Sequence, residues 1–350
     1  MKICIVTIYN GSNYGGFLQA FALKNYIEQL GHDVYHLNNK ARNPRVDGIK
    51  AILKKMRNFE TSGYSYQVKK AKVFHKISKQ FKEIKMNDNE LDNMDLFVLG
   101  SDEIWNITRK RLRDYPSFYG GGIPDGKKII SYAPSANKAE LKDFLNYRDV
   151  SDNLNKLKFI SVRDNHTKKV IEEFTGREDI DVVVDPTMLL TKDYYEKIAK
   201  LPKMSKKYIA IYSYGNNLSK DSIKKLVKYA KEKNLKLVSL LEYFDWCDEN
   251  PIVTPKELLG YFIESEFIFT DTFHGSVFSI ILNKEFILGS VNSNKILNLL
   301  EMFNVKDRDL SKINSIDLIL NNSLNYVNIN YSLNDLRNFS RNILQTYIEE

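Results

Sequence analysis

The chain has 350 residues, of which 43% are hydrophobic and 27% charged, and its formal net charge is +8. This composition excludes a disordered tail, and the length favours two domains. The run Met1–Tyr9 is too short for a signal peptide, and no run of roughly 18 apolar residues predicts a membrane-spanning helix, so we expect a soluble cytoplasmic protein.

A β-α-β series opens the chain. The β-branched run Lys2–Ile8 is typical of a strand buried on both faces. Apolar residues at helical spacing predict a helix from about Leu18 to Leu30, with Gly31 as its C-terminal stop. Asp33–Leu37 is the second predicted strand. A start of this kind predicts a parallel sheet.

The excess positive charge is concentrated between Lys40 and Lys85, a region that we interpret as helices and loops. A solvated helical face is one interpretation of this charge. The other is attraction to an anionic surface. A membrane that carries a lipid-linked substrate is the better candidate for that surface, because no nucleic-acid recognition motif is present. The basic residues include Lys50, Lys54, Lys55, Arg57, Lys69, Lys70, Lys72, Lys76, Lys79, Lys82 and Lys85.

Further strands follow at regular intervals, and the polar stretch 200–207 is the best linker between two series of them. The two series predict an α/β fold with two Rossmann-like domains on parallel sheets, which face each other across a cleft. A final helix is predicted at Leu333–Ile348. The later strands are predicted at Asp95–Leu99, Lys128–Tyr132, Phe159–Val162, Asp181–Val184, Tyr208–Tyr212, Lys236–Leu240, Phe267–Phe269 and Lys284–Leu288.

The stretch Thr270-Asp-Thr-Phe-His-Gly275 reads as a turn between a strand and a helix. Ligands bind at the carboxyl ends of strands in open α/β sheets, and amides at a helix start face anions. A histidine transfers protons near neutral pH. His274 is therefore either a catalytic residue or a buried structural histidine.

Two other strand ends carry candidate residues. Arg163 either grips a carboxylate or phosphate with its guanidinium fork or pairs with Asp164 at the surface. Asp102 either caps a helix or binds or deprotonates a hydroxyl. Trp105, three residues further on, either stacks on a sugar ring or fills the core, and we favour the core.

The loop Asn10–Gly16 resembles a phosphate cradle but matches neither common motif. Its glycines do not fit GxGxxG, and Phe17 replaces the lysine of a Walker-A sequence. We therefore expect neither ATP hydrolysis nor nicotinamide chemistry, although the glycines allow close approach of a ligand. Cys247 has no basic neighbour that would activate it as a nucleophile. No metal site is expected, because the five histidines are scattered.

Six motifs occur in an order that resembles the polysaccharide pyruvyl transferase family. The resemblance covers roughly residues 3 to 290 and implies a fold like that of glycosyltransferase B enzymes. It places residues 1–199, with a helical insert at about 40–90, on the acceptor side, residues 200–330 on the donor side, and residues 331–350 in a C-terminal helix. The motifs are Tyr9–Gln19, Gly100–Asn106, Ser131–Ala133, Ser161–Arg163, Val184–Thr187 and Thr270–Gly275.

The resemblance also implies a reaction, in which the enolpyruvyl unit of phosphoenolpyruvate moves to a sugar, usually as a cyclic ketal. It implies that His274 is catalytic and that Arg163 holds phosphoenolpyruvate, and we add Asp102 as a candidate base. Some members carry arginine where this chain has Thr272. The expected acceptor is a lipid- or nucleotide-linked precursor of a cell-surface polysaccharide, and no cofactor is expected. The other expected substrate-binding residues are Asn10, Asn13, Tyr14, Gly15, Gly16, Ser101, Thr272, Gly275 and Ser276.

Two alternatives stay open at this point. A glycosyltransferase of the B fold would use a nucleotide sugar in place of phosphoenolpyruvate. A glycan-binding protein without catalytic activity would bind the acceptor with both His274 and Arg163 dispensable.

Overall fold

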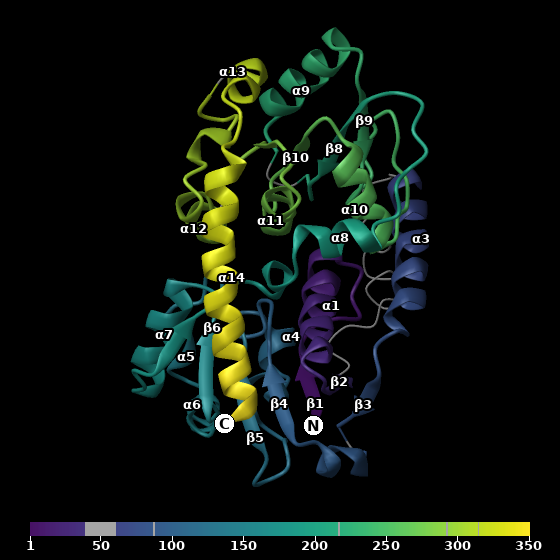
Figure 1. Cartoon of the computed structure of the whole chain (residues 1–350). Helices are drawn as coiled ribbons and strands as arrows, with labels where there is room; N and C mark the ends of the chain where they lie inside the picture. Colours follow the sequence, from purple (N-terminus) through teal and green to yellow (C-terminus); the bar gives the residue numbers. More distant parts are fainter. Residues whose placement is uncertain (39–60, 87, 216–217, 292, 314) are drawn as a thin grey trace. The chain divides into compact units, whose positions relative to one another are not determined.

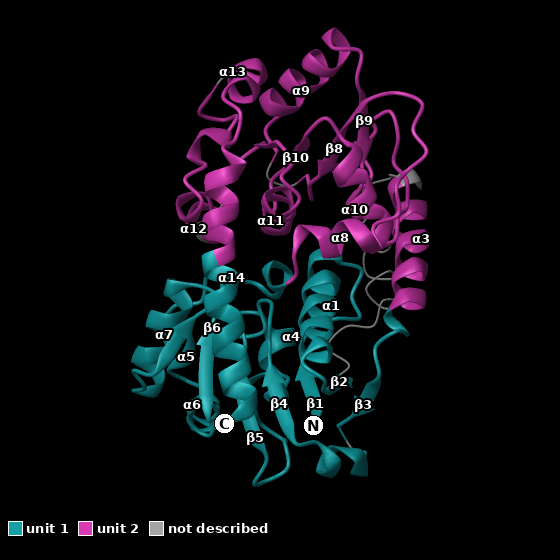
Figure 2. Ribbon diagram, in the orientation of Figure 1, with its two compact units in different colours: residues 1–43, 78–189, 335–350 teal, residues 44–77, 190–334 magenta. Residues whose placement is uncertain are grey.

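The structure is a computed structural model that describes residues 1–38, 61–86, 88–215, 218–291, 293–313 and 315–350 (Figure 1). Contacts within the chain divide it into two compact units, which are coloured separately in Figure 2. Unit 1 comprises Met1–Asn43, Ser78–Leu189 and Asp335–Glu350, and unit 2 comprises Pro44–Ile77 and Leu190–Asn334.

Unit 1 is built on a seven-stranded parallel sheet in the order β3-β2-β1-β4-β5-β6-β7. The chain order reverses between β1 and β4. The loops after these two strands therefore lie at the switch point where such sheets bind ligands. The strands are β1 (Lys2–Val6), β2 (Asp33–Asn38), β3 (Glu83–Lys85), β4 (Leu96–Leu99), β5 (Lys128–Ser131), β6 (Phe159–Val162) and β7 (Ile180–Val182).

The central strands of unit 1 are apolar on both faces. β1 pairs with β4 in the register Cys4 opposite Phe97, and the paired side chains are fully buried. A strand covered on both sides has no reason to alternate polar and apolar residues, which explains the continuous apolar runs of the sequence.

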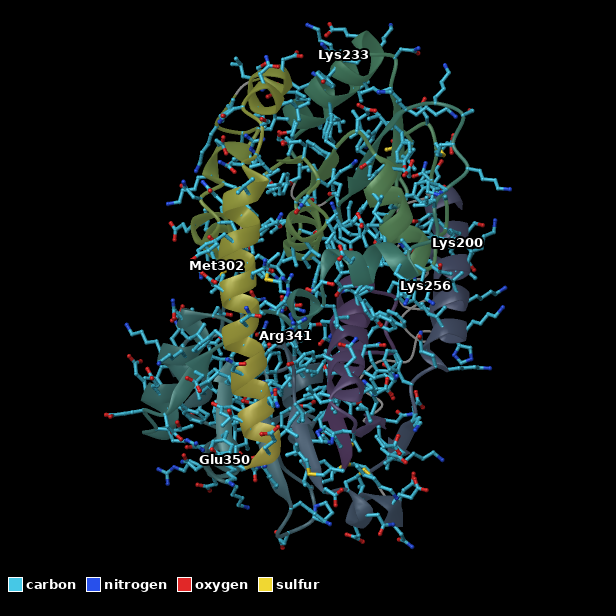
Figure 3. The ribbon with its side chains drawn as sticks, viewed as in Figure 1. Lys200, Lys233, Lys256, Met302, Arg341 and Glu350 are labelled. Carbon is cyan, nitrogen blue, oxygen red and sulfur yellow. The ribbon has the colours of Figure 1, made fainter. Side chains whose placement is uncertain are left out.

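Helices connect the strands of unit 1 and include part of the C-terminal helix α14 (Tyr326–Glu349). Arg341 of α14, labelled in Figure 3, donates from Nε to the Leu189 carbonyl (3.0 Å) and lies 5.3 Å from the Tyr26 ring centroid. The Tyr347 hydroxyl donates to Asp181 (2.6 Å). The other helices are α1 (Tyr14–Gln29), α4 (Lys110–Arg113), α5 (Leu141–Phe144), α6 (Arg148–Asn155), α7 (Asn165–Thr175), η1 (Asn89–Asn93), η2 (Pro116–Tyr119) and η3 (Pro186–Leu189).

Unit 2 is built on a four-stranded parallel sheet in the order β11-β10-β8-β9. Its apolar core includes Ile209, Phe269 and Ile287 from three of the strands. The strands are β8 (Tyr208–Tyr212), β9 (Lys236–Ser239), β10 (Ile268–Thr270) and β11 (Phe286–Leu288).

The helices of unit 2 surround this sheet. The Lys200 amide donates to the Lys256 carbonyl (2.9 Å), which ties the segment after α8 to the first turn of α10; both residues are labelled in Figure 3. Among the described residues, no helix is long and apolar enough to cross a membrane. The helices are α3 (Thr61–Ser78), α8 (Lys192–Ile198), α9 (Lys220–Glu232), α10 (Pro255–Glu264), α11 (Phe273–Ile281), α12 (Asn294–Met302), α13 (Ile316–Asn321) and η4 (Lys306–Arg308).

Helix α3 belongs to unit 2 as far as Ile77, whereas the sequence placed the lysine-rich insert with the first domain. One face of α3 is buried and includes Phe74 and Lys70. The Lys70 ammonium donates to the Leu241 carbonyl (2.5 Å) just after β9. This contact between residues distant in the sequence assigns the helix to unit 2, and no local sequence pattern predicts it.

The predicted α/β fold with two Rossmann-like, parallel-sheet domains is confirmed. The sequence missed β3, because three residues at a sheet edge in a lysine-rich region give no apolar run. It also began the last helix at Leu333, whereas α14 begins at Tyr326. The cleft expected between the two domains stays a prediction.

Candidate active site

Hydroxyl groups at the end of β10 fix the start of helix α11. Thr270 Oγ1 donates to the Tyr212 carbonyl on β8 (2.6 Å) and accepts from the Thr272 amide (3.0 Å). Thr272 is the N-cap, and its Oγ1 accepts from the Gly275 amide (2.9 Å). The strand, turn and helix start predicted from the sequence are therefore present, and Thr272 has a structural role in them.

Gly275 is required by the close approach of α11 to β10. A Cβ at this position would lie 2.2 Å from Thr270 Oγ1 and 2.8 Å from Thr272 Oγ1. Since such contacts are far below van der Waals distance, any larger residue would displace the cap or the end of the strand.

His274 is the partly exposed polar side chain of this first helical turn, and its Nε2 is buried. Phe273, Gly275 and Ser276 are buried, whereas His274 is partly exposed. Ser276 Oγ donates back to the Thr272 carbonyl (3.0 Å), so it serves the helix. The His274 ring meets the edge of Phe273, with centroids 5.3 Å apart. An imidazole is thus presented where the helix dipole favours negative charge.

Asp271 lies directly before the cap and was not among the predicted site residues. It is only 6% exposed. Burial raises the pKa of its carboxyl, while Ser213 and the Tyr214 backbone, in the loop after β8, act in the opposite direction. Asp271 therefore places a buried carboxyl near the loop after β8, and neither of its oxygens has a hydrogen-bond partner within the described residues.

In unit 1, side chains of the loop after β1 and of helix α1 form hydrogen bonds that hold this loop. Asn13 caps α1, and its Oδ1 accepts from the amides of Gly15 (2.9 Å) and Gly16 (3.4 Å). Gln19 Nε2 donates to Thr7 Oγ1 (3.1 Å) within the same loop. The hydrogen bonds to Asn13 occupy backbone amides that would otherwise be free to bind phosphate. This agrees with the sequence of the loop, which matches neither GxGxxG nor Walker A.

Asp102 reaches over this helix start from the loop after β4. A Cβ on Gly16 would lie 3.3 Å from Asp102 Oδ2, so the absence of a side chain at Gly16 makes room for the carboxylate. Asp102 has a φ of 71°, in the left-handed region that few residues adopt. Its carbonyl accepts from the Ser135 amide (2.9 Å), and its side chain is partly exposed. No described helix has Asp102 as its cap, so the capping alternative is not observed.

Arg163 is buried rather than exposed, and its partner is Asp185 rather than Asp164. Arg163 Nη1 lies 3.1 Å from Asp185 Oδ2, and the two side chains are 3% and 0% exposed. Asp185 Oδ1 also accepts from the Thr187 hydroxyl (2.7 Å). The predicted surface pair with Asp164 is therefore wrong.

The surroundings of Arg163 are acidic. Burial alone lowers the pKa of its guanidinium, but Asp185 and then Asp102 raise it, so that it lies above its usual value. Asp164 contributes in the same direction, although it is itself the cap of α7 and accepts from the Thr167 amide (2.8 Å). Any anion that binds Arg163 has to compete with these carboxylates.

The structure thus divides the predicted site residues between two sheet edges. In unit 1, Asp102, Gly16 and Arg163 lie along the carboxyl edge, and Asn10 is partly exposed in the same loop as Asn13. Tyr14 and Ser101 are fully buried, and Ser101 Oγ donates to the Ala133 carbonyl (2.7 Å). Thr272, His274, Gly275 and Ser276 share the edge of unit 2.

Two other sequence interpretations have structural answers. Trp105 is fully buried, and its Nε1 donates to the Phe118 carbonyl (2.8 Å), so it fills the core. Burial raises the pKa of the Cys247 thiol, which disfavours a thiolate nucleophile. Among the described residues, no three His, Cys, Asp or Glu side chains are grouped as a metal site.

Sequence reasoning missed two carboxyls at these edges. Asp185 entered the sequence analysis only within the motif Val184–Thr187, and Asp271 only within the turn Thr270–Gly275. Both carboxyls belong to the polar residues that follow a predicted strand, and both lie within the motifs given above. This position is the signal that would have found them.

Comparisons with known proteins agree with this architecture. The family model described as "Polysaccharide pyruvyl transferase" matches residues 13–293. A comparison with curated protein sequences finds no match.

Solved structures share the fold at very low sequence identity. A putative UDP-N-acetylglucosamine 2-epimerase from Listeria monocytogenes has a TM-score of 0.57 at 8% identity, with 99% of this chain and 95% of that chain covered. The UDP-GlcNAc 2-epimerase from Neisseria meningitidis, bound to UDP-GlcNAc, has a TM-score of 0.51 at 10% identity, with 100% of both chains covered. At this identity the similarity concerns the fold alone.

Proposed function

Since the chain belongs to the polysaccharide pyruvyl transferase family and is therefore a transferase, we propose that it moves the enolpyruvyl group of phosphoenolpyruvate to sugar hydroxyls of a polysaccharide precursor. The observation that carries this proposal is His274, a partly exposed imidazole at the capped start of α11, within the family match. A helix start attracts an anionic substrate, and imidazole is suited to proton transfer near neutral pH.

The proposed reaction begins with proton transfer from His274 to the methylene carbon of phosphoenolpyruvate. The carbon that bears the phosphate gains oxocarbenium character, and a sugar hydroxyl attacks it and gives up its proton. The C–O bond to phosphate then breaks, and a second hydroxyl closes the ketal. One of the two hydroxyl protons restores the histidine, and the other leaves with phosphate.

We propose Asp102 as the group that accepts the proton of the first hydroxyl and passes it to the departing phosphate. It is a partly exposed carboxylate at the switch point of the unit 1 sheet, where hydroxyl donors are natural ligands. For Arg163 we propose a contact with the carboxylate or phosphate of phosphoenolpyruvate, made while Nη1 keeps its ion pair with Asp185.

We further propose a cytoplasmic reaction with a lipid- or nucleotide-linked sugar as acceptor. No cofactor or metal takes part in the proposed steps, since proton transfer and charge stabilisation suffice for them.

The test is phosphate release from phosphoenolpyruvate in the presence of sugar acceptors of both kinds. His274→Ala should lower the rate by about 10²–10⁴-fold, the range of a general acid. His32→Ala is the matched control, because His32 precedes β2 at the opposite, amino edge of its sheet and should leave the rate unchanged. Near-normal turnover of His274→Ala would exclude this residue as the acid.

The same assay separates the two alternative functions. A glycosyltransferase would release nucleotide from UDP- or GDP-sugars and ignore phosphoenolpyruvate. A glycan-binding protein would bind the acceptor equally well in the His274→Ala and Arg163→Lys variants and would release neither product.

A further inference from the structure

The exposed face of α3 carries lysines without acids. The helix spans Thr61–Ser78, 18 residues with no Asp or Glu among them. Lys69, Lys72 and Lys76 are all exposed. Their spacing of three and four residues puts them in one row along the helix.

The opposite face of α3 is fixed to unit 2, so the direction of this row is set. Tyr66, Lys70 and Phe74 are buried, and the Lys70 ammonium donates to the Leu241 carbonyl. Lys70 shows what a lysine on the packed face does: it donates to a backbone carbonyl. The three exposed lysines therefore point away from the core of unit 2.

Some lysines on other helices meet an acid one turn away. On α7, Lys168 lies 3.5 Å from Glu172, and on α9, Lys228 lies 3.8 Å from Glu232. Pairs of this kind neutralise a helix surface. Within the described ranges, none of the three α3 lysines lies within ion-pair distance of a carboxylate.

We propose that the face of α3 formed by Lys69, Lys72 and Lys76 binds the surface of an anionic lipid membrane. Along the helix axis these residues span about 10 Å, and a flat charged surface meets all three at once. Of the basic segment noted in the sequence, residues 50–60 lie outside the described residues and take no part in this inference.

The chemistry of the face favours lipid over nucleic acid. A lysine ammonium is a compact point charge suited to diffuse attraction, whereas nucleic-acid readout relies on the planar fork of arginine or on stacking aromatics. Helix α3 contains no arginine. Ser65 is the other exposed residue in line with the row, and the exposed Tyr64 lies off it. This contact does not depend on the reaction proposed for His274.

The test is co-sedimentation of the full chain with vesicles of phosphatidylcholine alone or of phosphatidylcholine with an equal part of phosphatidylglycerol. Binding should require phosphatidylglycerol and should fall as ionic strength rises from about 0.01 M to about 0.5 M. The triple variant Lys69→Gln, Lys72→Gln, Lys76→Gln should bind roughly 100-fold more weakly, at about fivefold per lysine.

The matched control removes the same charge from α9, which lies in the same unit. The variant Lys224→Gln, Lys228→Gln, Lys231→Gln repeats the spacing of three and four residues on exposed positions. It should lose less than about threefold, since α9 also carries Asp221 and Glu232.

Three results would overturn the assignment. They are equal losses in the two triple variants, no binding of the unmodified chain to anionic vesicles at low salt, and tighter binding to duplex DNA than to these vesicles in the same buffer. Circular dichroism of both variants should match that of the unmodified chain, because all six substituted positions are exposed.

Discussion

The carboxyl edges of the two sheets carry different sets of charged and polar side chains. In unit 1, the buried cation Arg163 lies near Asp185, Asp102 and Asp164. In unit 2, the edge around α11 consists of hydroxyls, the buried carboxyl of Asp271 and the partly exposed ring of His274. Both edges end strands and begin helices, so the difference lies in the side chains alone.

This difference indicates which ligand groups each edge favours. An edge rich in carboxylates repels free phosphate and accepts hydrogen bonds from sugar hydroxyls. A helix start attracts an anion through its backbone dipoles, although the Asp271 carboxyl lies directly before the cap of α11. Sugar hydroxyls are therefore favoured beside Asp102, whereas an anion is favoured at the start of α11 or, in competition with the nearby carboxylates, at Arg163.

The largest expected effect comes from breaking the buried ion pair of unit 1. Arg163→Met should cost about 3–5 kcal/mol of unfolding free energy, because Asp185 would stay buried without its cation. The double variant Arg163→Met, Asp185→Leu should recover most of this loss. Urea unfolding measures both, and a double variant no more stable than the single one would contradict the charge explanation.

Alanine substitution should lower the stability by different amounts at Gly275, at the start of α11, and at Gly16, at the start of α1. Gly275→Ala should cost about 1–3 kcal/mol, because its Cβ would meet Thr270 Oγ1 at 2.2 Å. Gly16→Ala should cost less, since its Cβ would meet Asp102 Oδ2 at 3.3 Å, and Asp102 is partly exposed. The melting temperatures of the two variants test this order. Equal decreases in melting temperature would mean that the two helix starts are packed alike.

The buried carboxyl of Asp271 predicts that the stability of unit 2 depends on pH. Burial raises the pKa of its carboxyl above the ordinary 3.8, so the folded chain keeps this proton to higher pH than the unfolded chain. Its contribution to stability is therefore greatest below pH 3.8 and declines as pH rises through the raised pKa.

Asp271→Asn removes this titration while keeping the shape of the side chain. The melting temperature of the unmodified chain minus that of the variant should fall as pH rises from 3.8, and should then level off. A difference that rises over this range would show that the native site stabilises the carboxylate instead.

The smallest expected effect is loss of the helix caps. Thr272→Ala and Asn13→Ala should each cost about 1 kcal/mol, because each removes a side-chain acceptor of the first helical turn. Thr272→Ser should retain the stability of the original residue in urea unfolding. A larger loss of phosphate release than of stability in Thr272→Ala would indicate that this hydroxyl also contacts substrate.

The sequence by itself determined the α/β class, the parallel sheets and the strand ends that carry polar residues. These features are local: continuous apolar runs give buried strands, helical spacing gives crossover helices, and the polar residues that follow each strand fall at the carboxyl edge. The predicted order of elements therefore matches the structure at nearly every strand.

Only the tertiary structure decided how the residues of each edge are partnered. Arg163 finds Asp185 rather than its neighbour Asp164, Asp102 lies over Gly16, and α3 packs on unit 2 through Lys70. Each of these contacts joins segments from different strands or helices. The apolar pattern of a single element fixes which face is buried, but it carries no information on which distant group will meet that face.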